Sequence, residues 1–285
     1  MNSLFQHKKD MMEAGRRLYE KGLVASADGN ISVRVAPNEI LATTAGVCKG
    51  LLSSEHIVQV DLQGKRVGGK GEPSSELKMH LLIYRERPDV KAVVHAHPPV
   101  STGFAVAGIP LAQCILPEVV VSLGSVPIAA YGTPSTDEVC DAILPIVGRA
   151  NAFLLANHGV VTLGEDVFQA YYRMETVEHF AKILLTARML GNVNVLTRDQ
   201  VEKLIDLRKK SGMKGKLPNC ESCGYCGGAI QAPAGSQKAE ARSASPARQS
   251  PQKPVQTSRQ AAAAAKDKDL MDIITSVIKD ITQEK

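Results

Sequence analysis

The sequence predicts an α/β domain, because segments in which apolar residues recur at helical spacing alternate with short apolar runs typical of buried strands. The clearest helical segments are residues 3–22 and 166–190, and the clearest strand-like runs are residues 39–45 and 152–161. With 285 residues, the chain is long enough for one sizeable domain with appendages or for two small domains.

Turn residues separate the predicted elements along the chain. The first elements are a helix over residues 3–22, a strand over 31–34, strands over 39–45 and 57–62, and a helix after the loop at 71–76. A strand over 90–94, a helix near 101–107, sheet segments at 109–111, 118–121 and 126–131, and a helix over 136–147 follow. The last are a strand over 152–161, interrupted by Asn-His-Gly, and a helix over 166–190 whose apolar stripe we assign to the core.

Two histidines follow the strand at residues 90–94, and we expect the site to be arranged around them. His95 and His97 lie two residues apart, so on a strand both imidazoles point to the same face. Imidazole is a common zinc ligand, and a catalytic zinc site uses three protein ligands and leaves one position open. His158 also ends an apolar run and can supply the third imidazole. A hydrogen-bonded pair of histidines near the surface is the alternative.

Polar residues at two predicted turns indicate an anion site. Gly29 and Asn30 precede a strand, where backbone N–H groups and an amide can face an anion. Ser74 and Ser75 lie where a helix begins, and a helix N-terminus offers N–H donors to a phosphate. Glu76 stands in the first turn of that helix. Ordinary turns and a plain helix cap are the alternatives.

Together these motifs resemble the class II aldolase/adducin family. The matching motifs, in chain order, are Gly29-Asn30, Gly46, Ser74-Ser75-Glu76, His95-Ala96-His97 and Asn157-His158-Gly159. The resemblance covers residues 1–210 and is closest to the aldolases of that family that cleave L-fuculose 1-phosphate. It implies a three-layer α/β/α sandwich with a mixed, largely antiparallel central sheet. It also implies a homotetramer with active sites between subunits.

The resemblance implies a role for each matching residue. His95, His97 and His158 match the ligands of one Zn2+ per subunit, and Glu76 matches the catalytic acid/base beside the metal. The positions that match the phosphate pocket are Gly29, Asn30, Thr44, Gly46, Ser74 and Ser75. The implied reaction is zinc-dependent retro-aldol cleavage of a deoxyketose 1-phosphate, such as L-fuculose 1-phosphate, to dihydroxyacetone phosphate and lactaldehyde. Zinc stabilises the charge of an enediolate in such a reaction, while Glu76 moves the proton.

Two departures from the family pattern lie where the substrate would bind. Ala45 stands where a hydroxyl is expected, so that Thr43 or Thr44 replaces it. Cys114 occupies the approximate place of the tyrosine that protonates the leaving group, which leaves Tyr131 and Glu118 as alternative proton donors.

Relatives of the same fold leave other functions open. They include a sugar-phosphate epimerase, a dehydratase, and adducin, which is a non-catalytic scaffold. The complete set of three histidines and Glu76 argues against a scaffold of the adducin type, but it does not separate an aldolase from an epimerase or a dehydratase.

Charge is divided unevenly along the chain. Residues 1–206 contain 20 Lys and Arg against 22 Asp and Glu, while residues 207–285 contain 14 against 7. The net charge of +5 therefore belongs to the tail and says little about partners of the domain. The N-terminus lacks the apolar core of a signal peptide, no apolar run approaches the length of a membrane span, and six cysteines fit a reducing compartment. We expect a cytoplasmic protein that binds neither membranes nor nucleic acid.

The tail is expected to follow a catalytic domain of residues 1–217. Within residues 218–228, the run Cys220, Cys223 and Cys226 has a spacing that binds a second metal or part of an iron–sulfur cluster; a flexible loop with thiols is the alternative. Residues 229–266 contain few large apolar side chains and predict a disordered linker.

An amphipathic helix is predicted for residues 267–285. Its apolar residues recur at helical spacing, at Leu270, Ile273, Ile274, Val277, Ile278 and Ile281. A short helix on such a linker resembles the encapsulation peptides that direct enzymes into bacterial microcompartments, which implies a shell protein as partner and a location inside the compartment. A helix on a membrane surface is disfavoured by its acidic polar face, and a cap on the catalytic domain is the other alternative.

Overall fold

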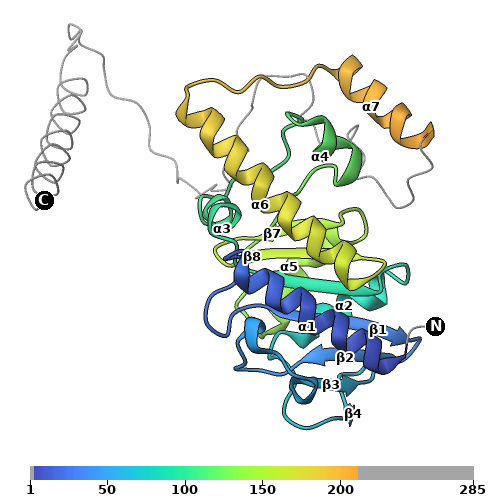
Figure 1. Cartoon of the computed structure of the whole chain (residues 1–285). Coiled ribbons are helices and arrows are strands. Elements are labelled where there is room, and N and C mark those ends of the chain that lie inside the picture. Colours follow the sequence, from blue (N-terminus) through green and yellow to red (C-terminus); the bar gives the residue numbers. More distant parts are fainter. Residues whose placement is uncertain (1–2, 211–285) are drawn as a thin grey trace, which may run out of the picture. The chain divides into compact units, whose positions relative to one another are not determined.

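The computed structural model describes residues 3–210. The predicted segments at 218–228, with Cys220, Cys223 and Cys226, at 229–266 and at 267–285 lie outside these residues. The described part contains an eight-stranded sheet with helices packed on it (Figure 1). None of its helices is both long enough and apolar enough to cross a membrane.

The central sheet is mixed and largely antiparallel, as predicted. Its strand order is β4-β3-β2-β1-β5-β8-β7-β6, and within it only β6 and β7 pair in parallel. The strands are β1 (Asn30–Ala36), β2 (Glu39–Thr43), β3 (Ile57–Val60), β4 (Arg66–Gly68), β5 (Ala92–Ala96), β6 (Ile128–Ala129), β7 (Ala152–Leu155) and β8 (Gly159–Gly164).

Helices cover both faces of the sheet and complete the predicted three-layer sandwich. One hydrophobic core lies between the sheet and helices α1, α3 and α6, and a second core lies between the opposite face and helices α2 and α5. The helices are α1 (Leu4–Glu20), α2 (Leu77–Glu86), α3 (Pro99–Val106), α4 (Pro117–Ser122), α5 (Asp137–Val147), α6 (Val167–Met189) and α7 (Arg198–Lys210), with short 3-10 helices η1 (Lys49–Leu51) and η2 (Ser54–His56).

Strand β5 lies between β1 and β8 near the middle of the sheet, and every one of its residues is buried. Val94 and Ala96 face the first core, whereas Val93 faces the second. A strand buried on both faces needs apolar residues throughout, which explains its unbroken apolar run. His95 falls on the same face as Val93, the face that α2 covers.

Three predicted elements differ in the structure. The sheet segment expected at 109–111 is reduced to an isolated bridge between Leu111 and Val126. Residues 118–121, which we expected in the sheet, belong to α4. Pro117 begins this helix, where its fixed φ angle is favourable, and Val119 and Val120 pack into two different hydrophobic clusters. Packing of the helix therefore overrides the strand preference of the valines. The run at 152–161 is a hairpin of β7 and β8, and α7 was not predicted.

Candidate active site

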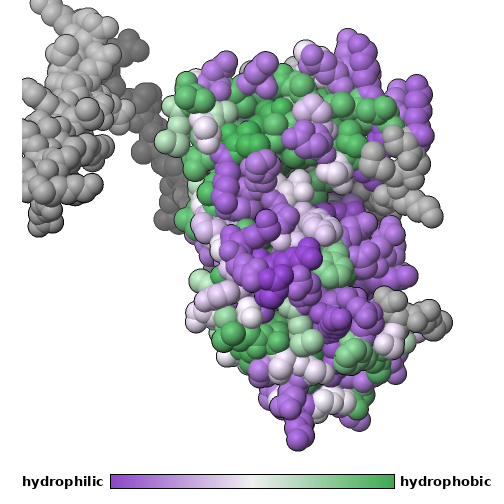
Figure 2. All heavy atoms as spheres, in the orientation of Figure 1, coloured by the Kyte–Doolittle hydropathy of each residue, from purple (hydrophilic) through white to green (hydrophobic). Residues whose placement is uncertain are grey.

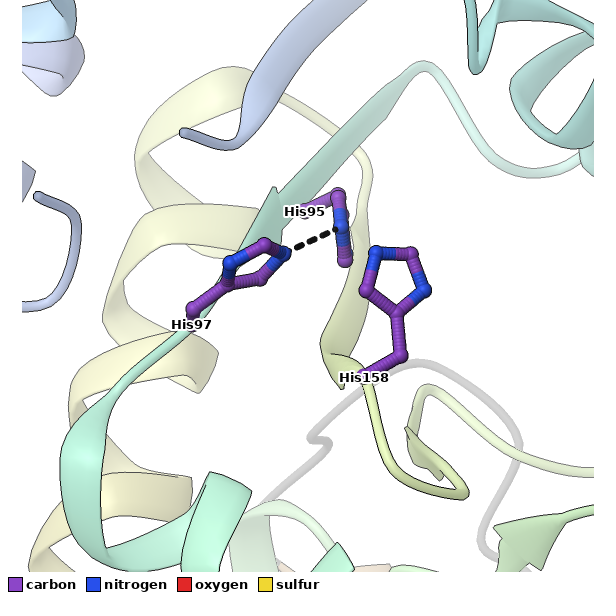
Figure 3. A group of neighbouring side chains, drawn as sticks. All are labelled: His95, His97 and His158. Carbon is purple, nitrogen blue, oxygen red and sulfur yellow. Dashed lines mark hydrogen bonds between the residues drawn. The ribbon is translucent and has the colours of Figure 1, made fainter. Parts of the chain in front are cut away.

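Three histidines from two neighbouring parts of the sheet form a cluster. His95 is the penultimate residue of β5, His97 follows that strand, and His158 lies in the turn between β7 and β8. Because β5 pairs with β8, the turn brings His158 beside the end of β5. The ring centroids lie 4.7 to 5.0 Å apart, and one ligand nitrogen from each residue lies within 4.8 Å of the others. Figure 3 shows the three rings turned toward one another.

Two glycines allow the strands around the cluster to approach closely. A Cβ atom on Gly159 would lie 2.6 Å from the carbonyl oxygen of Ala96 and from Cδ2 of His97. A Cβ atom on Gly29, which has a φ angle of +72°, would lie 2.6 Å from the carbonyl oxygen of His95. Side chains at either position would push these backbones apart, so the glycines are part of the site's geometry.

The surroundings of His95 keep it neutral and orient its ring. Its buried Nδ1 lies 2.9 Å from the carbonyl oxygen of Val160. A carbonyl only accepts hydrogen bonds, so Nδ1 donates and the lone pair is left on Nε2, 3.1 Å from Nε2 of His97. Burial, and next the adjacent His97 and His158, hold the pKa of His95 well below its usual range. Burial also lowers the pKa of His158. Neutral imidazole is the form that binds a metal ion.

Glu76, the residue before α2, brings a carboxylate to the cluster. Its Oε2 lies 3.4 Å from Nε2 of His95, and its Oε1 lies 3.3 Å from Nε2 of His158. The side-chain amide of Asn30 donates to Oε2 at 2.8 Å. Oε1 is buried and accepts no hydrogen bond from the described residues. One carboxylate oxygen is therefore held in place, while the other is available to a ligand or a proton.

The three imidazoles form a donor set that can hold one metal ion. Zinc–nitrogen bonds of about 2.1 Å place two nitrogens of a tetrahedral site about 3.4 Å apart, which is close to the observed 3.1 Å between His95 and His97. Asp28 Oδ2 lies 3.6 Å from Nδ1 of His97, where a carboxylate can orient a metal ligand. Three imidazole ligands leave the fourth position of a tetrahedral zinc open to a substrate, which is the pattern of a catalytic site.

The residues predicted to bind phosphate lie on loops that meet beside Glu76. The backbone N–H of Ser74 donates to the carbonyl of Thr43 at 3.0 Å, which joins the loop before α2 to the end of β2. The Thr43 hydroxyl in turn accepts from the N–H of Ile31 at 3.1 Å, so β2 is tied to the start of β1. Asn30, at that start, reaches Glu76 directly.

Free hydrogen-bond donors are present on these loops. Within residues 3–210, the backbone N–H groups of Gly46 and Ser75 form no hydrogen bond. The Ser74 hydroxyl accepts weakly from the N–H of Glu76 at 3.4 Å, and Thr44 is largely buried and donates to the carbonyl of His56 at 3.3 Å. Free N–H groups beside a helix N-terminus form a favourable environment for an anion.

The candidate proton donors lie on the surface of the described part of the chain. Tyr131 follows β6 and Glu118 is in the first turn of α4, and both side chains are exposed. In the described part of the chain, neither forms a hydrogen bond or ion pair with the histidines or with Glu76. Cys114 is buried with Val120 and Val201 between α4 and α7. The roles assigned to Tyr131 and Glu118 therefore remain predictions.

Sequence analysis did not predict two buried polar features near the site. One is a hydrogen-bonded network of Ser32, His80 and Tyr84, and the other is the side chain of Lys49. Ser32 Oγ lies 2.7 Å from Nδ1 of His80 and 2.8 Å from the hydroxyl of Tyr84. Glu76, His80 and Tyr84 recur every four residues, and this spacing was a signal that one polar edge of α2 faces inward. Lys49 is also buried, and no periodic signal marks it because its 3-10 helix has only three residues.

Known proteins match this chain in sequence and in fold. Residues 9–185 match the family model of the class II aldolase and adducin N-terminal domain. A 3-oxo-tetronate 4-phosphate decarboxylase of Pectobacterium atrosepticum is 32% identical over 203 residues, which cover 69% of this chain and 91% of that protein. An L-fuculose phosphate aldolase of Methanococcus vannielii is 34% identical over 175 residues, which cover 61% and 93%.

The fold agrees with these matches. A solved structure of an L-fuculose 1-phosphate aldolase superposes with a TM-score of 0.68 at 30% identity, over 73% of this chain and 98% of that chain. The matched region contains all three histidines and Glu76. The chain belongs to the class II aldolase and adducin family, and its relatives there identify it as an enzyme of the lyase type.

Proposed function

We propose that this protein is a zinc-dependent aldolase that cleaves L-fuculose 1-phosphate, or a similar deoxyketose 1-phosphate, to dihydroxyacetone phosphate and lactaldehyde. One observation carries the proposal: the Glu76 carboxylate lies 3.3 to 3.4 Å from two imidazoles of a cluster that can hold a metal ion. A base beside a Lewis acid is suited to proton transfer next to a carbonyl group. The relatives that are L-fuculose phosphate aldolases support this choice of substrate.

Each part of the site has a task in this reaction. When bound, zinc would stabilise the negative charge that develops on the substrate oxygens. The carbon–carbon bond breaks as the hydroxyl next to it gives its proton to the group predicted at the leaving aldehyde, Tyr131 or Glu118, and the aldehyde leaves. That group returns the proton to water, and Glu76 takes one up from water. Glu76 then delivers a proton to the carbon that remains, with Asn30 holding the carboxylate through Oε2. The free N–H groups of Gly46 and Ser75 bind the phosphate and orient the substrate.

A second reaction, decarboxylation of 3-oxo-tetronate 4-phosphate, is supported by the relatives that are decarboxylases of this acid. Loss of carbon dioxide from this acid leaves an enediol that becomes dihydroxyacetone phosphate once its carbon is protonated. That step uses Glu76 in the same way, but no substrate hydroxyl has to be deprotonated. Within residues 3–210, Tyr131 and Glu118 form no hydrogen bond or ion pair with the cluster, and this reaction requires none. A decarboxylase relative is as similar in sequence as the aldolases.

We also propose that the chain assembles as a homotetramer and enters a microcompartment. Large apolar side chains are exposed at the C-terminal end of α6, at Leu185, Met189 and Leu190. Figure 2 shows hydrophobic residues gathered over α4 and this end of α6, and contact with a second subunit would bury them. The proposed partner in the shell is a protein that binds residues 267–285, which lie outside the described part.

The two reactions are separated by one experiment with zinc-loaded protein. Dihydroxyacetone phosphate is measured with a coupled reductase after addition of L-fuculose 1-phosphate or of 3-oxo-tetronate 4-phosphate. We expect chelator-sensitive product from L-fuculose 1-phosphate. Product and carbon dioxide from the acid alone would assign the decarboxylase. Product from neither would overturn both proposals and favour an epimerase or a dehydratase.

The metal is tested with two histidine variants. His95→Ala removes a ligand, and we expect it to abolish both zinc binding and activity. His179→Ala is the matched control, because His179 is exposed on α6. Full activity of His95→Ala would refute the assigned metal site.

A further inference from the structure

Lys49 is a buried lysine that has no role in the mechanism described so far. It begins η1, and its side chain is only 1% exposed. Its ammonium group donates hydrogen bonds to the carbonyl oxygens of Ala27, at 2.9 Å, and of Val47. Ala27 lies two residues before Gly29, and Val47 directly follows Gly46. A single ammonium group therefore connects the two loops that carry the predicted phosphate-binding glycines.

The backbone of η1, which carries the Lys49 side chain, packs directly on α1. A Cβ atom on Gly15 would lie 2.6 Å from the carbonyl oxygen of Lys49, and a Cβ atom on Gly50 would lie 2.6 Å from the ring of Tyr19. The 3-10 helix η1 thus packs directly on α1 at two glycines. Because its backbone is held in this way, the Lys49 side chain can act as a rigid link between the loops.

The charge of Lys49 has no direct counter-ion. Among the described residues, its hydrogen-bond partners are backbone carbonyls, and no carboxylate lies within ion-pair distance. Burial lowers the pKa of Lys49, and Cys48, Asp28 and Glu76 act in the opposite direction from further away. Burial of an ammonium group is unfavourable unless charge or dipoles compensate it. An anion bound to the Gly29 and Gly46 loops would compensate the buried positive charge of Lys49.

We infer that Lys49 is a positioning residue for the phosphate group of the substrate. It holds the Gly29 and Gly46 loops at a fixed separation, and its positive potential favours a phosphate dianion over the neutral part of the substrate. The inference rests on the phosphate pocket of the proposed function, but it holds for any phosphorylated substrate of this site.

Binding of two small acids to the zinc-loaded full chain tests the inference without catalysis. Phosphoglycolate carries a carboxylate for the metal and a phosphate for the pocket, whereas glycolate carries a carboxylate and a hydroxyl but no phosphate. Affinities are measured by calorimetry for the wild type, for Lys49→Met, and for Lys78→Met. Lys78 is an exposed lysine on α2 two residues after Glu76, so this control removes the same charge nearby without touching the loops.

Because hydrogen bonds to a charged group are involved, we expect Lys49→Met to bind phosphoglycolate about tenfold more weakly or worse. Glycolate affinity and zinc content should stay within about twofold of wild type, as should all values for Lys78→Met. Equal weakening of both acids would show a purely structural role and overturn the inference. Unchanged phosphoglycolate binding would overturn it as well. Neither result depends on aldolase activity, so failure of the proposed reaction is recognised separately.

A second variant tests the charge if Lys49→Met does not fold. Lys49→Gln keeps an amide that can donate to the loop carbonyls but removes the positive charge. We expect it to lose most of the preference of the site for phosphoglycolate over glycolate. A preference equal to that of wild type would overturn the electrostatic part of the inference.

Discussion

Glu76 has two carboxylate oxygens in different surroundings, and this difference sets its expected chemistry. Asn30 holds Oε2, while the buried Oε1 accepts no hydrogen bond within the described residues. Glu76→Gln keeps the shape of the side chain but removes its ability to carry a proton. We expect turnover to fall by about 100-fold to 10,000-fold, as is typical for loss of a general acid or base. Zinc content should not change, because the three histidines remain.

Metal analysis and steady-state kinetics measure the two quantities. Glu72→Gln is the matched control. It replaces the same carboxylate by the same amide, but at a side chain that is 84% exposed on the loop before α2. Unchanged turnover in Glu76→Gln would remove Glu76 from the mechanism.

His80 gives the fold a specific dependence on pH. Burial, with a smaller effect of His95, lowers the pKa of His80 from 6.5 to about 3. Between these values the unfolded chain binds a proton at this position and the folded chain does not. Stability is therefore highest above pH 6.5 and falls as the pH is lowered toward 3, by up to about 1.4 kcal/mol per pH unit from this residue.

Denaturant unfolding of the zinc-free protein at several pH values measures this slope. In His80→Gln the amide can still bond to Ser32, but the titration is gone, so we expect a shallower loss of stability below pH 6.5. An identical slope in both proteins would show that His80 is not responsible.

At the level of single residues, the sequence predicted the three clustered histidines from their positions at the ends of apolar runs. His95, His97 and His158 each follow or end an apolar run, and such positions gather at one edge of a sheet. Lys49 was not predictable in this way, because a lysine in a loop is normally exposed and only tertiary packing buries it.

The β7–β8 hairpin is the element that completes the histidine cluster. Gly159 begins β8, and its missing side chain leaves room for the Ala96 carbonyl and the His97 ring. Gly159→Ala would place a methyl group 2.6 Å from both, so the hairpin must shift. We expect a loss of about 1 to 3 kcal/mol in the free energy of unfolding, as for other overpacked sites. We also expect weaker zinc binding, because His158 moves with the turn.

Gly103→Ala is the control for this change. Gly103 lies within α3, and a methyl group added there would have no neighbouring atom of the described residues within 4 Å. Alanine also favours a helix by about 0.5 to 1 kcal/mol over glycine. Calorimetric unfolding and zinc titration compare the two variants. Normal zinc affinity in Gly159→Ala would show that the turn can adjust without moving His158.

Elements with a strong local pattern were predicted correctly, and those decided by packing were not. Helix α6 begins after Asp166, whose side chain accepts from the N–H of Gln169, and its long apolar stripe was visible in the sequence. Helix α4 has only six residues, and its valines alone favour a strand. Its contacts with the main core and with α7 decide its conformation, and these contacts are not encoded locally.

At the scale of the whole molecule, the two candidate reactions share an enediol intermediate. Both give dihydroxyacetone phosphate, so the metal cluster, Glu76 and the phosphate loops can serve either of them. The difference lies in the group that leaves, which is an aldehyde or carbon dioxide. The choice between them therefore depends on residues that contact the leaving group, and a second subunit of the proposed tetramer can contribute these.

The C-terminal segment is expected to be separable from catalysis. Residues 3–210 contain the three histidines, Glu76 and the loops beside them, so deletion of residues 267–285 should leave zinc content and turnover within about twofold of wild type. The same deletion should abolish co-purification with microcompartment shell proteins, because it removes the apolar stripe predicted to bind them. Expression beside the shell proteins, followed by isolation of the compartments and an assay of aldolase activity, measures both effects.

A point variant separates the apolar stripe from the length of the tail. Ile274→Asp places a charge in the middle of that stripe and should release the enzyme as the deletion does, whereas Lys279→Gln on the polar side should not. Continued co-purification of the deleted protein would refute the targeting role. A large change in turnover on deletion would instead support a helix that caps the catalytic domain, since a segment that binds only the shell has no means of altering a complete active site.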